Sequence, residues 1–217
     1  MNAALVVCAS AVICLVIAEW AQSKTAKAAA KMSAASSFLA MAFACGALES
    51  TYGRLLLTGL VLCWIGDACL LSSGRSLAFL IGIGAFLLGH LAYAIAFHQL
   101  GIHPGALLGA ALVVGSLGVF VLRWLRPHVP EDFRIPVFCY VGVISLMVAM
   151  SIGAFVAGAP MLLAVGAIGF AISDVFVARE RFVQSGFINP ALGLPSYFGS
   201  QILLAYTIKL VAISSVA

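Results

Sequence analysis

The sequence predicts an all-α integral membrane protein, in which residues 1–217 form a single domain, a bundle of about eight transmembrane helices. Composition is the first observation: 64% of the 217 residues are hydrophobic and 8% are charged, whereas a soluble domain carries about 25% charged residues. Hydropathy is the second, because the apolar residues gather in eight runs close to the roughly 20 residues that span a bilayer as a helix. A soluble core of this size cannot bury so much apolar surface.

Three polar breaks divide the first half of the chain. A connector with three lysines, residues 22–31, follows the first run, and residues 49–54 form a turn after the second. Ser73-Gly74-Arg75 turns the chain after the third run, as small and polar residues do between periodic segments. The first four predicted spans are residues 3–20, 32–48, 55–72 and 76–99.

Glycine and proline mark the breaks in the second half. Residues 101–104 end the fourth run, residues 126–134 form the longest polar connector, and residues 158–160 form a tight break. Residues 179–195 are predicted to form a polar loop, and Pro136 is tolerated in the first turn of the sixth span. The last four predicted spans are residues 105–125, 135–157, 161–178 and 194–216.

Positive charge is concentrated in alternate connectors. Those after the first, third, fifth and seventh spans hold Lys24, Lys27, Lys31, Arg75, Arg123, Arg126, Arg134, Arg179 and Arg181. The opposite side holds Arg54 and Lys209. Because cytoplasmic loops carry the excess of lysine and arginine, we expect these four connectors in the cytoplasm and both termini outside. The net charge of +4 therefore reflects topology and does not predict a nucleic-acid partner.

Two aspartates, Asp67 and Asp174, lie inside apolar runs near the ends of the third and seventh spans. A charged side chain in a span costs about 2.5–3.5 kcal/mol on insertion scales and marks a functional site by default. The functional interpretation is a carboxylate pair that supplies an acid and a base, since two close carboxylates do not both ionise cheaply. The alternative is that each pairs separately with a cation, Lys31 with one and Arg75 or Arg181 with the other.

Further polar residues fall at the depth of the two aspartates, counted from the cytoplasmic span ends with a rise of about 1.5 Å per residue. They are Glu19, Lys31, Tyr197 and Gln201. His90 lies fourteen residues into its span, nearer the midplane, and shares one helix face with Tyr93 and Phe97 at i, i+3 and i+7. For His90, a proton shuttle or headgroup contact and a structural interhelical hydrogen bond are equal alternatives.

Several kinds of catalytic site have no counterpart in the sequence. It contains no HExxH motif, no helical histidine pair with metal-ligand spacing, no GxSxG nucleophile motif and no P-loop, which are the local patterns of zinc, serine and phosphate sites. The six cysteines form no CxxC pair and are interpreted as small core residues. We therefore expect a site without metal or other cofactor.

The sequence around the two aspartates shows a weak internal similarity. Gly66-Asp67 near the end of the third span is matched by Ser173-Asp174 near the end of the seventh, four spans later. A parallel four-plus-four duplication would relate the halves by an axis along the membrane normal, with the aspartates facing each other at equal depth. The alternative is a chance match of two short segments.

These residues together resemble a known family through short pieces in a fixed order. The pieces are Lys31, Gly66-Asp67-x-x-Leu70-Leu71, Phe86-x-x-Gly89-His90-x-x-Tyr93, Pro136-Val137-x-x-Tyr140, Ser173-Asp174 and Tyr197-x-Gly199-x-Gln201-x-Leu203. They resemble the lysoplasmalogenase (YhhN-like) family of integral membrane proteins over nearly the whole chain. The resemblance implies hydrolysis of the vinyl ether bond of lysoplasmalogens to a fatty aldehyde and a glycerophospho-ethanolamine or -choline, with a lysophospholipid and membrane lipids as partners.

The chemistry implied by this resemblance needs no metal and no nucleophilic serine. Protonation of the vinyl ether carbon generates an oxocarbenium ion, which a carboxylate stabilises while water adds, as in glycosidases. Asp67 and Asp174 would be the acid and the base, in an order that the sequence leaves open. The expected substrate-binding residues are Lys31 at the phosphate, His90, Tyr197 and Gln201 at water or substrate, and Tyr93 and Glu19 beside them.

Two other functions fit the same residues. Buried aspartates in parallel repeats also suit a small proton-coupled transporter, although the third and seventh spans lack the midspan proline of many broken transporter helices. In a non-catalytic lipid-binding protein the carboxylates would only pair with basic residues. We expect location in the plasma membrane, the inner membrane of a bacterium, with the site open toward the cytoplasm.

Overall fold

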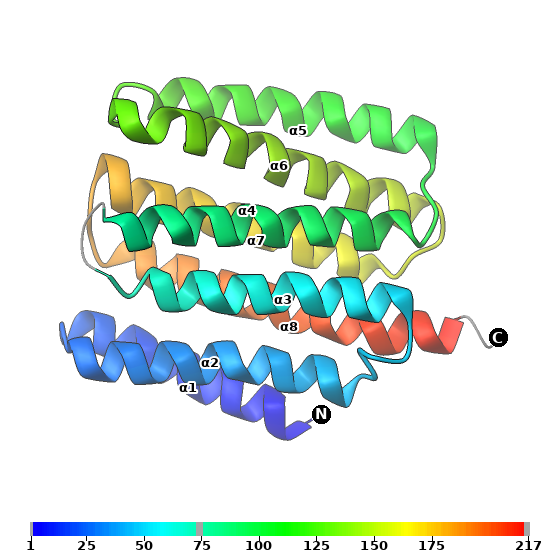
Figure 1. The fold of residues 1–217 in the computed structure, drawn as a ribbon, viewed down its shortest axis with the longest axis horizontal. Helices are drawn as coiled ribbons and strands as arrows, with labels where there is room; N and C mark the ends of the chain where they lie inside the picture. Colours follow the sequence, from blue (N-terminus) through cyan, green and yellow to red (C-terminus); the bar gives the residue numbers. More distant parts are fainter. Residues whose placement is uncertain (1, 73–75, 215–217) are drawn as a thin grey trace.

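The computed structural model describes residues 2–72 and 76–214, and these residues form helices and short connections. Eight α-helices lie side by side (Figure 1). They are α1 (Asn2–Trp20), α2 (Lys24–Ala44), α3 (Thr51–Cys69), α4 (Leu77–His98), α5 (Pro104–Leu125), α6 (Glu131–Val156), α7 (Met161–Ala178) and α8 (Ile188–Ser214). A π-helical turn, η1 (Arg179–Val183), continues α7.

Seven of these helices are long and apolar enough to cross a membrane. Within the described ranges, α2 is the one α-helix outside this set, because three lysines and many alanines and serines lower its hydropathy. It nevertheless lies between α1 and α3 and runs along the bundle with them (Figure 1). The predicted helical membrane bundle is confirmed.

Helices extend beyond the apolar runs at three places where the sequence predicted connectors. The lysine connector is helical from Lys24, since alanine and lysine favour helix and Ser23 accepts the cap bond. α6 begins at Glu131, because acidic side chains are favourable in a first turn. The predicted loop 179–195 is largely helical, with η1 at its start and Pro195 inside α8.

The two ends of the bundle differ in which connections between helices lie there. The α1–α2, α5–α6 and α7–α8 connections lie at the left-hand end in Figure 1, where α3 ends and α4 begins, whereas α1 begins and α8 ends toward the opposite side. This up-and-down order is the one that eight antiparallel spans produce. That the left-hand end faces the cytoplasm remains a prediction from charge.

Most of the contacts between helices repeat after four helices, although α1 and α3 also contact α8 more extensively than α5 and α7 contact α4. α1 packs on α2 and α3 on α4, as α5 packs on α6 and α7 on α8. α2 contacts α3 as α6 contacts α7, and across the halves α2 meets α8 as α6 meets α4. This pattern is the arrangement that a four-plus-four parallel duplication produces.

Glycines allow the close α3–α4 and α7–α8 crossings. A Cβ at Gly59 would overlap the ring of Tyr93, and one at Gly89 would lie 2.9 Å from Cys63 Sγ. In the second half, a Cβ at Gly166 would lie 2.9 Å from Leu204 Cγ. Small residues at such crossings let helix backbones approach in a membrane protein, and here they set the positions of the two aspartate-bearing helices.

Candidate functional site

Asp67 lies in the last turn of α3 and is 1% exposed. Lys31 of α2 places Nζ 3.2 Å from Asp67 Oδ1. The Tyr197 hydroxyl of α8 donates a hydrogen bond of 2.6 Å to Asp67 Oδ2. A charge removed from water needs both a counter-ion and hydrogen bonds, and these two partners supply them. These are the partners that a buried carboxylate requires.

A hydrogen-bond chain extends from Asp67 toward the middle of the bundle. Gln201 Nε2 donates to the Tyr197 hydroxyl at 3.2 Å, and the Tyr93 hydroxyl of α4 donates to Gln201 Oε1 at 2.7 Å. All four side chains are buried. The chain fixes the Tyr197 hydroxyl and, through it, one oxygen of Asp67.

Asp174 of α7 has a different set of partners. The Tyr140 hydroxyl of α6 donates a 2.8 Å hydrogen bond to Asp174 Oδ2, and His90 Nε2 lies 3.5 Å from the same oxygen. The Asp174 side chain is 17% exposed, against 2% for Asp67. Asp174 is thus the more accessible of the two carboxyl groups.

The orientation of the His90 ring defines what faces Asp174. Nδ1 lies 2.6 Å from the Phe86 carbonyl oxygen, which can only accept, so Nδ1 carries a proton. The neutral ring then presents the lone pair of Nε2. Within the described residues, this nitrogen is the one fully buried side-chain polar atom without a hydrogen-bond partner. A proton on Asp174, or a bridging water, would complete the contact.

Phe170 joins the two aspartate environments. Its ring lies one helical turn before Asp174 on α7, with centroid distances of 4.3 Å to His90 and 5.1 Å to Tyr197. The partners of both carboxyl groups therefore flank one aromatic ring. The result is a cluster of charged and hydrogen-bonding groups with an apolar aromatic wall.

Residues of each half of the chain contact the aspartate of the other half, in an approximately two-fold pattern. His90 and Tyr197 each follow the aspartate of their own half by 23 residues (67 to 90, 174 to 197). Each contacts the aspartate of the other half. The helix preceding each aspartate supplies the second partner, Lys31 in one half and Tyr140 in the other. His90 and Tyr197 therefore occupy equivalent positions in the two halves. The sequence comparison matched the two aspartates but not these two residues.

The alternative of separate cation partners holds for one aspartate. Lys31 pairs with Asp67. Arg181 Nη2 donates to the Leu70 carbonyl at 2.9 Å, and the groups that face Asp174 at close range are Tyr140 and His90. Arg75, the other predicted cation, lies outside the described residues. The two carboxyl groups are consequently unequal.

The structure brings together all but one of the predicted site residues. Glu19 Oε1 lies 2.6 Å from Lys27 Nζ, at the α1–α2 connection, because the helical lysine connector returns Lys27 beside it. Tyr140 was not predicted as a site residue, since a tyrosine in an apolar span looks like an ordinary membrane aromatic. Tyr140 belongs to the Pro136-Val137-x-x-Tyr140 piece of the sixth span that resembles the family, and this position could have identified it.

The cluster also lies deeper than the span limits indicated. η1 extends α7 to Val183, and α8 begins at Ile188, so Asp174 and Tyr197 each lie more than two helical turns from the end of the bundle. This depth explains why His90, expected nearer the midplane, reaches Asp174. Within the described residues, no three metal-ligating side chains come together.

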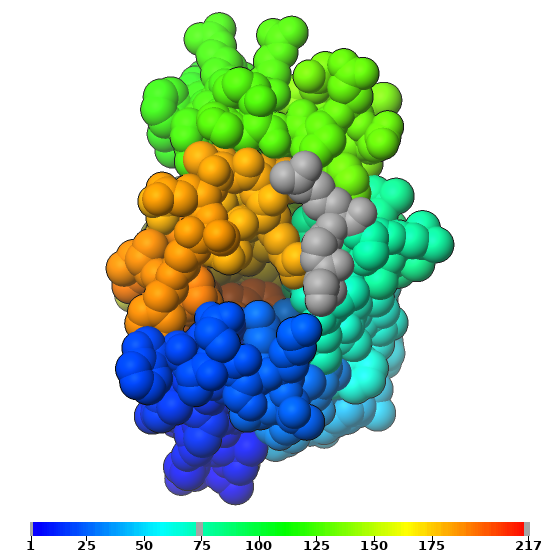
Figure 2. All heavy atoms as spheres, turned by 90° about the vertical axis from the view of Figure 1, so that its left-hand side faces the viewer, coloured from blue at the N-terminus to red at the C-terminus, as the bar shows by residue number. Residues whose placement is uncertain are grey.

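A recess leads inward from the connector end of the molecule. Figure 2, which looks at that end, shows it between the orange segment that contains η1 and the blue segment that contains the start of α2, with α8 in dark red at depth. α2, α7 and α8 are three of the helices that carry the cluster. The recess therefore opens beside helices that carry the cluster.

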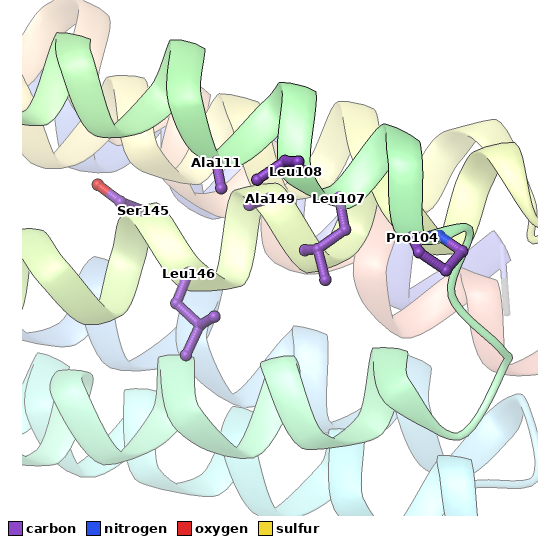
Figure 3. Close-up of a pocket in the computed structure, with 7 residues that line it drawn as sticks. All are labelled: Pro104, Leu107, Leu108, Ala111, Ser145, Leu146 and Ala149. Atoms are coloured by element: carbon purple, nitrogen blue, oxygen red, sulfur yellow. The ribbon is translucent and has the colours of Figure 1, made fainter.

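A separate apolar groove lies between α5 and α6 (Figure 3). It is lined by Pro104, Leu107, Leu108, Ala111, Ser145, Leu146 and Ala149. No ionisable side chain belongs to this lining, and Leu108 is 64% exposed. Such a surface suits lipid chains of the bilayer and supplies no catalytic group.

Comparison with known proteins identifies the family. The sequence profile of the YhhN family matches residues 26–208. A Mycobacterium bovis protein named lysoplasmalogenase is 35% identical over 161 residues, covering 70% of this chain and 59% of its own length. The human lysoplasmalogenase TMEM86B is 33% identical over 153 residues, covering 70% of this chain and 62% of its own length.

The share of each protein that the matches cover determines whether they establish the family. The chain spans about three fifths of the length of the curated relatives that it matches. No solved structure matches it. The family profile nevertheless covers most of the chain, including Lys31, Asp67, His90, Asp174 and Tyr197. The chain therefore belongs to the YhhN family.

Proposed function

We propose that this protein is a membrane hydrolase that cleaves the vinyl ether bond of lysoplasmalogens to a fatty aldehyde and a glycerophospho-base. The observation that carries the proposal is a cluster with two unequal carboxyl groups, Asp67 paired with Lys31 and Asp174 facing Tyr140 and His90. Vinyl ether hydrolysis needs one proton donor and one anion near an oxocarbenium ion. Relatives named lysoplasmalogenase support the choice of substrate.

The partners of the two aspartates support one assignment of the roles that the sequence left open. The ammonium of Lys31 keeps Asp67 as the anion, which stabilises the cation and accepts a proton from water. Asp174 faces the lone pair of the His90 imidazole, which suits a protonated carboxyl group, and the neutral phenol of Tyr140, whose hydrogen bond stabilises an anion less than the Lys31 ammonium does. Asp174 is therefore the acid that protonates the vinyl carbon, and its greater exposure fits contact with substrate.

The cycle returns both carboxyl groups to their starting states. Asp174 gives its proton to the β-carbon of the vinyl ether, which forms a C–H bond and leaves the oxocarbenium ion. Water adds to that ion while Asp67 takes one of its protons. The hemiacetal hydroxyl then returns a proton to Asp174, the glycerol oxygen receives the proton held by Asp67, and the C–O bond breaks.

The remaining side chains position these two groups. Tyr197 and Gln201, with Tyr93 behind them, fix the orientation of Asp67, while His90 and Tyr140 orient Asp174. Lys31 is 7% exposed and contacts Asp67, so we assign it to maintaining the anion and not to the phosphate. Glu19 pairs with Lys27 and is given no role.

Aldehyde release from purified protein tests this proposal. The protein in detergent micelles should release aldehyde from lysoplasmenyl-ethanolamine and release none from an ester-linked lysophospholipid. Asp67→Asn and Asp174→Asn should each abolish release while eluting as folded protein. Glu131→Gln is the matched control, because Glu131 is a solvent-exposed carboxylate paired with Arg134. Release by either aspartate variant at the parent rate contradicts the mechanism.

A proton-coupled transporter is the second candidate, favoured by the duplicated packing with ionisable groups where the halves meet. It predicts proton uptake into proteoliposomes driven by a lipid or small-solute gradient, and no aldehyde. Continuous helices across α3 and α7 favour the hydrolase, because many transporters break the helices at their binding site.

A further inference from the structure

We propose that Nε2 of His90 binds the free hydroxyl group of the lysolipid, on the glycerol carbon beside the vinyl ether, and so selects one-chain over two-chain plasmalogens. This inference rests on the proposed function, because it concerns the same substrate and the same site. Three observations carry it: a fixed histidine ring, a buried acceptor without a donor, and the position of that acceptor beside the proposed acid.

The His90 ring is held in one orientation by its surroundings. Nδ1 donates to the Phe86 carbonyl oxygen at 2.6 Å. The ring centroid lies 4.3 Å from that of Phe170 and 5.3 Å from that of Tyr140, which it meets edge to face. The residue is buried. Because close packing leaves such a ring little room to turn, the lone pair of Nε2 keeps a defined direction.

Among the residues that the structure describes, none donates a hydrogen bond to His90 Nε2. The Tyr140 hydroxyl, on the neighbouring ring, donates to Asp174 Oδ2 instead. Asp174 Oδ2 lies 3.5 Å from Nε2, beyond the usual range of about 2.7–3.2 Å, so a proton on Asp174 would bind Nε2 only weakly. A buried acceptor without a partner is unfavourable, and it indicates a ligand that donates.

The equivalent position in the other half of the chain has its partners. Tyr197, which corresponds to His90, donates to Asp67 at 2.6 Å and accepts from Gln201 Nε2 at 3.2 Å. Its hydroxyl is therefore satisfied both as a donor and as an acceptor. In the described part of the chain, the unpaired acceptor lies beside Asp174, which is also the more exposed carboxyl group. This difference favours a substrate contact at His90 and not at Tyr197.

The proposed reaction requires a new donor at this nitrogen. When Asp174 gives its proton to the vinyl carbon, that proton moves away from His90. A lysoplasmalogen brings a replacement, because the glycerol carbon beside the ether-bearing carbon carries a free hydroxyl. Nε2 and Asp174 Oδ2 are 3.5 Å apart, so one substrate molecule can place its hydroxyl at His90 and its vinyl ether at Asp174.

The same contact distinguishes lysolipids from two-chain plasmalogens. In a two-chain plasmalogen the middle hydroxyl is esterified, and an ester has acceptor oxygens but no O–H donor. Such a lipid would leave His90 Nε2 unpaired beside the reacting carboxyl group. A site built to bind a substrate hydroxyl rejects analogues without it, because its own polar group then stays unpaired. His90 therefore selects for the free hydroxyl.

Binding of two uncleavable probes tests this proposal. Both are lysophospholipids with a saturated alkyl ether in place of the vinyl ether, and in one of them hydrogen replaces the free hydroxyl. The parent protein should bind the hydroxyl probe about 10-fold more tightly than the deoxy probe. His90→Phe keeps a ring but has no lone pair, so it should bind both probes with similar affinity. His90→Gln offers an amide oxygen and should retain part of the preference.

The matched control is His128→Phe. His128 is exposed, and its Nδ1 lies 3.2 Å from the carbonyl oxygen of Trp124, four residues earlier, as Nδ1 of His90 lies beside that of Phe86. His128→Phe should keep the preference of the parent. The proposal is overturned if the parent binds both probes equally, as it would if water completed Nε2, if His90→Phe keeps the full preference, or if His128→Phe loses it.

A measurement that leaves His90 intact decides the case in which His90→Phe does not fold or binds neither probe. The other three histidines of the chain, His98, His103 and His128, are exposed. His98→Gln, His103→Asn and His128→Gln together leave His90 as the one histidine. In this protein, labelled with nitrogen-15 in histidine, the Nε2 resonance should shift when the hydroxyl probe binds and stay near its place with the deoxy probe. Equal shifts with both probes would overturn the proposal.

The outcome is separable from that of the proposed function. Neither probe is cleaved, so the preference reports on His90 whether or not the protein hydrolyses vinyl ethers. An intact hydroxyl preference without aldehyde release would refute the hydrolase alone. Aldehyde release without a hydroxyl preference would refute the His90 contact alone.

Discussion

The Lys31–Asp67 pair gives the sharpest prediction about the proposed mechanism. Lys31 Nζ and Asp67 Oδ1 are 3.2 Å apart, and both residues are buried. At an effective dielectric constant of about 20, the attraction between such charges is about 5 kcal/mol. Removing one partner of a buried pair costs about 3–5 kcal/mol, because the other charge is left uncompensated. Lys31→Met should therefore destabilise the protein by roughly this amount and remove aldehyde release.

A double variant distinguishes a lost charge pair from a packing defect. In Lys31→Met/Asp67→Asn neither charge remains, so much of the lost stability should return, while aldehyde release stays absent. Unfolding in detergent, followed by circular dichroism, measures stability in the parent, both single variants and the double variant. The coupling free energy from this cycle should be at least about 1.5 kcal/mol. Additive single effects, or full activity in Lys31→Met, would refute the ionic assignment of Asp67.

Three further predictions address contacts around the site. Tyr140→Phe removes the 2.8 Å hydrogen bond to Asp174 and should lower the rate of aldehyde release about tenfold, the effect of a lost hydrogen bond of about 1–1.5 kcal/mol. An unchanged rate would show that Tyr140 does not act at the site. Gly59→Ala should displace Tyr93 and reduce both stability and activity, whereas Gly84→Ala, where a Cβ meets open space, should affect neither. Equal effects of the two variants would contradict the close α3–α4 crossing at Gly59. Thr207→Val leaves the buried Tyr52 hydroxyl without its 2.6 Å partner and should cost about 1–3 kcal/mol of stability at unchanged substrate affinity, which unfolding and binding measurements check.

Some features of this protein follow from the sequence because a single physical rule controls them. The span at residues 161–178 coincides with α7, since an unbroken apolar run bounded by Pro160 and Arg179 leaves little choice of limits. The limits of α2 and α8 did not follow, because hydropathy marks where a helix enters the bilayer and not where the helix begins. The first turns of α2, from Lys24 to Ala30, lie before the apolar run. They are helical because alanine and lysine have high helix propensity.

The partners of the aspartates depend on tertiary packing and could not follow from the sequence. Counting residues along each span placed Asp67, Lys31 and Tyr197 at one end, but depth alone does not say which side chains face each other. Lys31 reaches Asp67 because α2 packs on α3. Tyr140 reaches Asp174 because α6 packs on α7. Each contact needs the rotation of a helix about its axis, which a nearly uniform apolar composition leaves undefined.

The repeated packing explains how one fold produces two unequal carboxyl groups. Each aspartate takes one partner from the preceding helix and one from the opposite half. If all partners matched, symmetry would give both carboxyl groups the same charge state. The preceding helix instead supplies an ammonium, Lys31, in one half and a phenol, Tyr140, in the other. An acid–base pair requires such a difference, which the exchange of Lys31 for Tyr140 provides together with that of Tyr197 for His90.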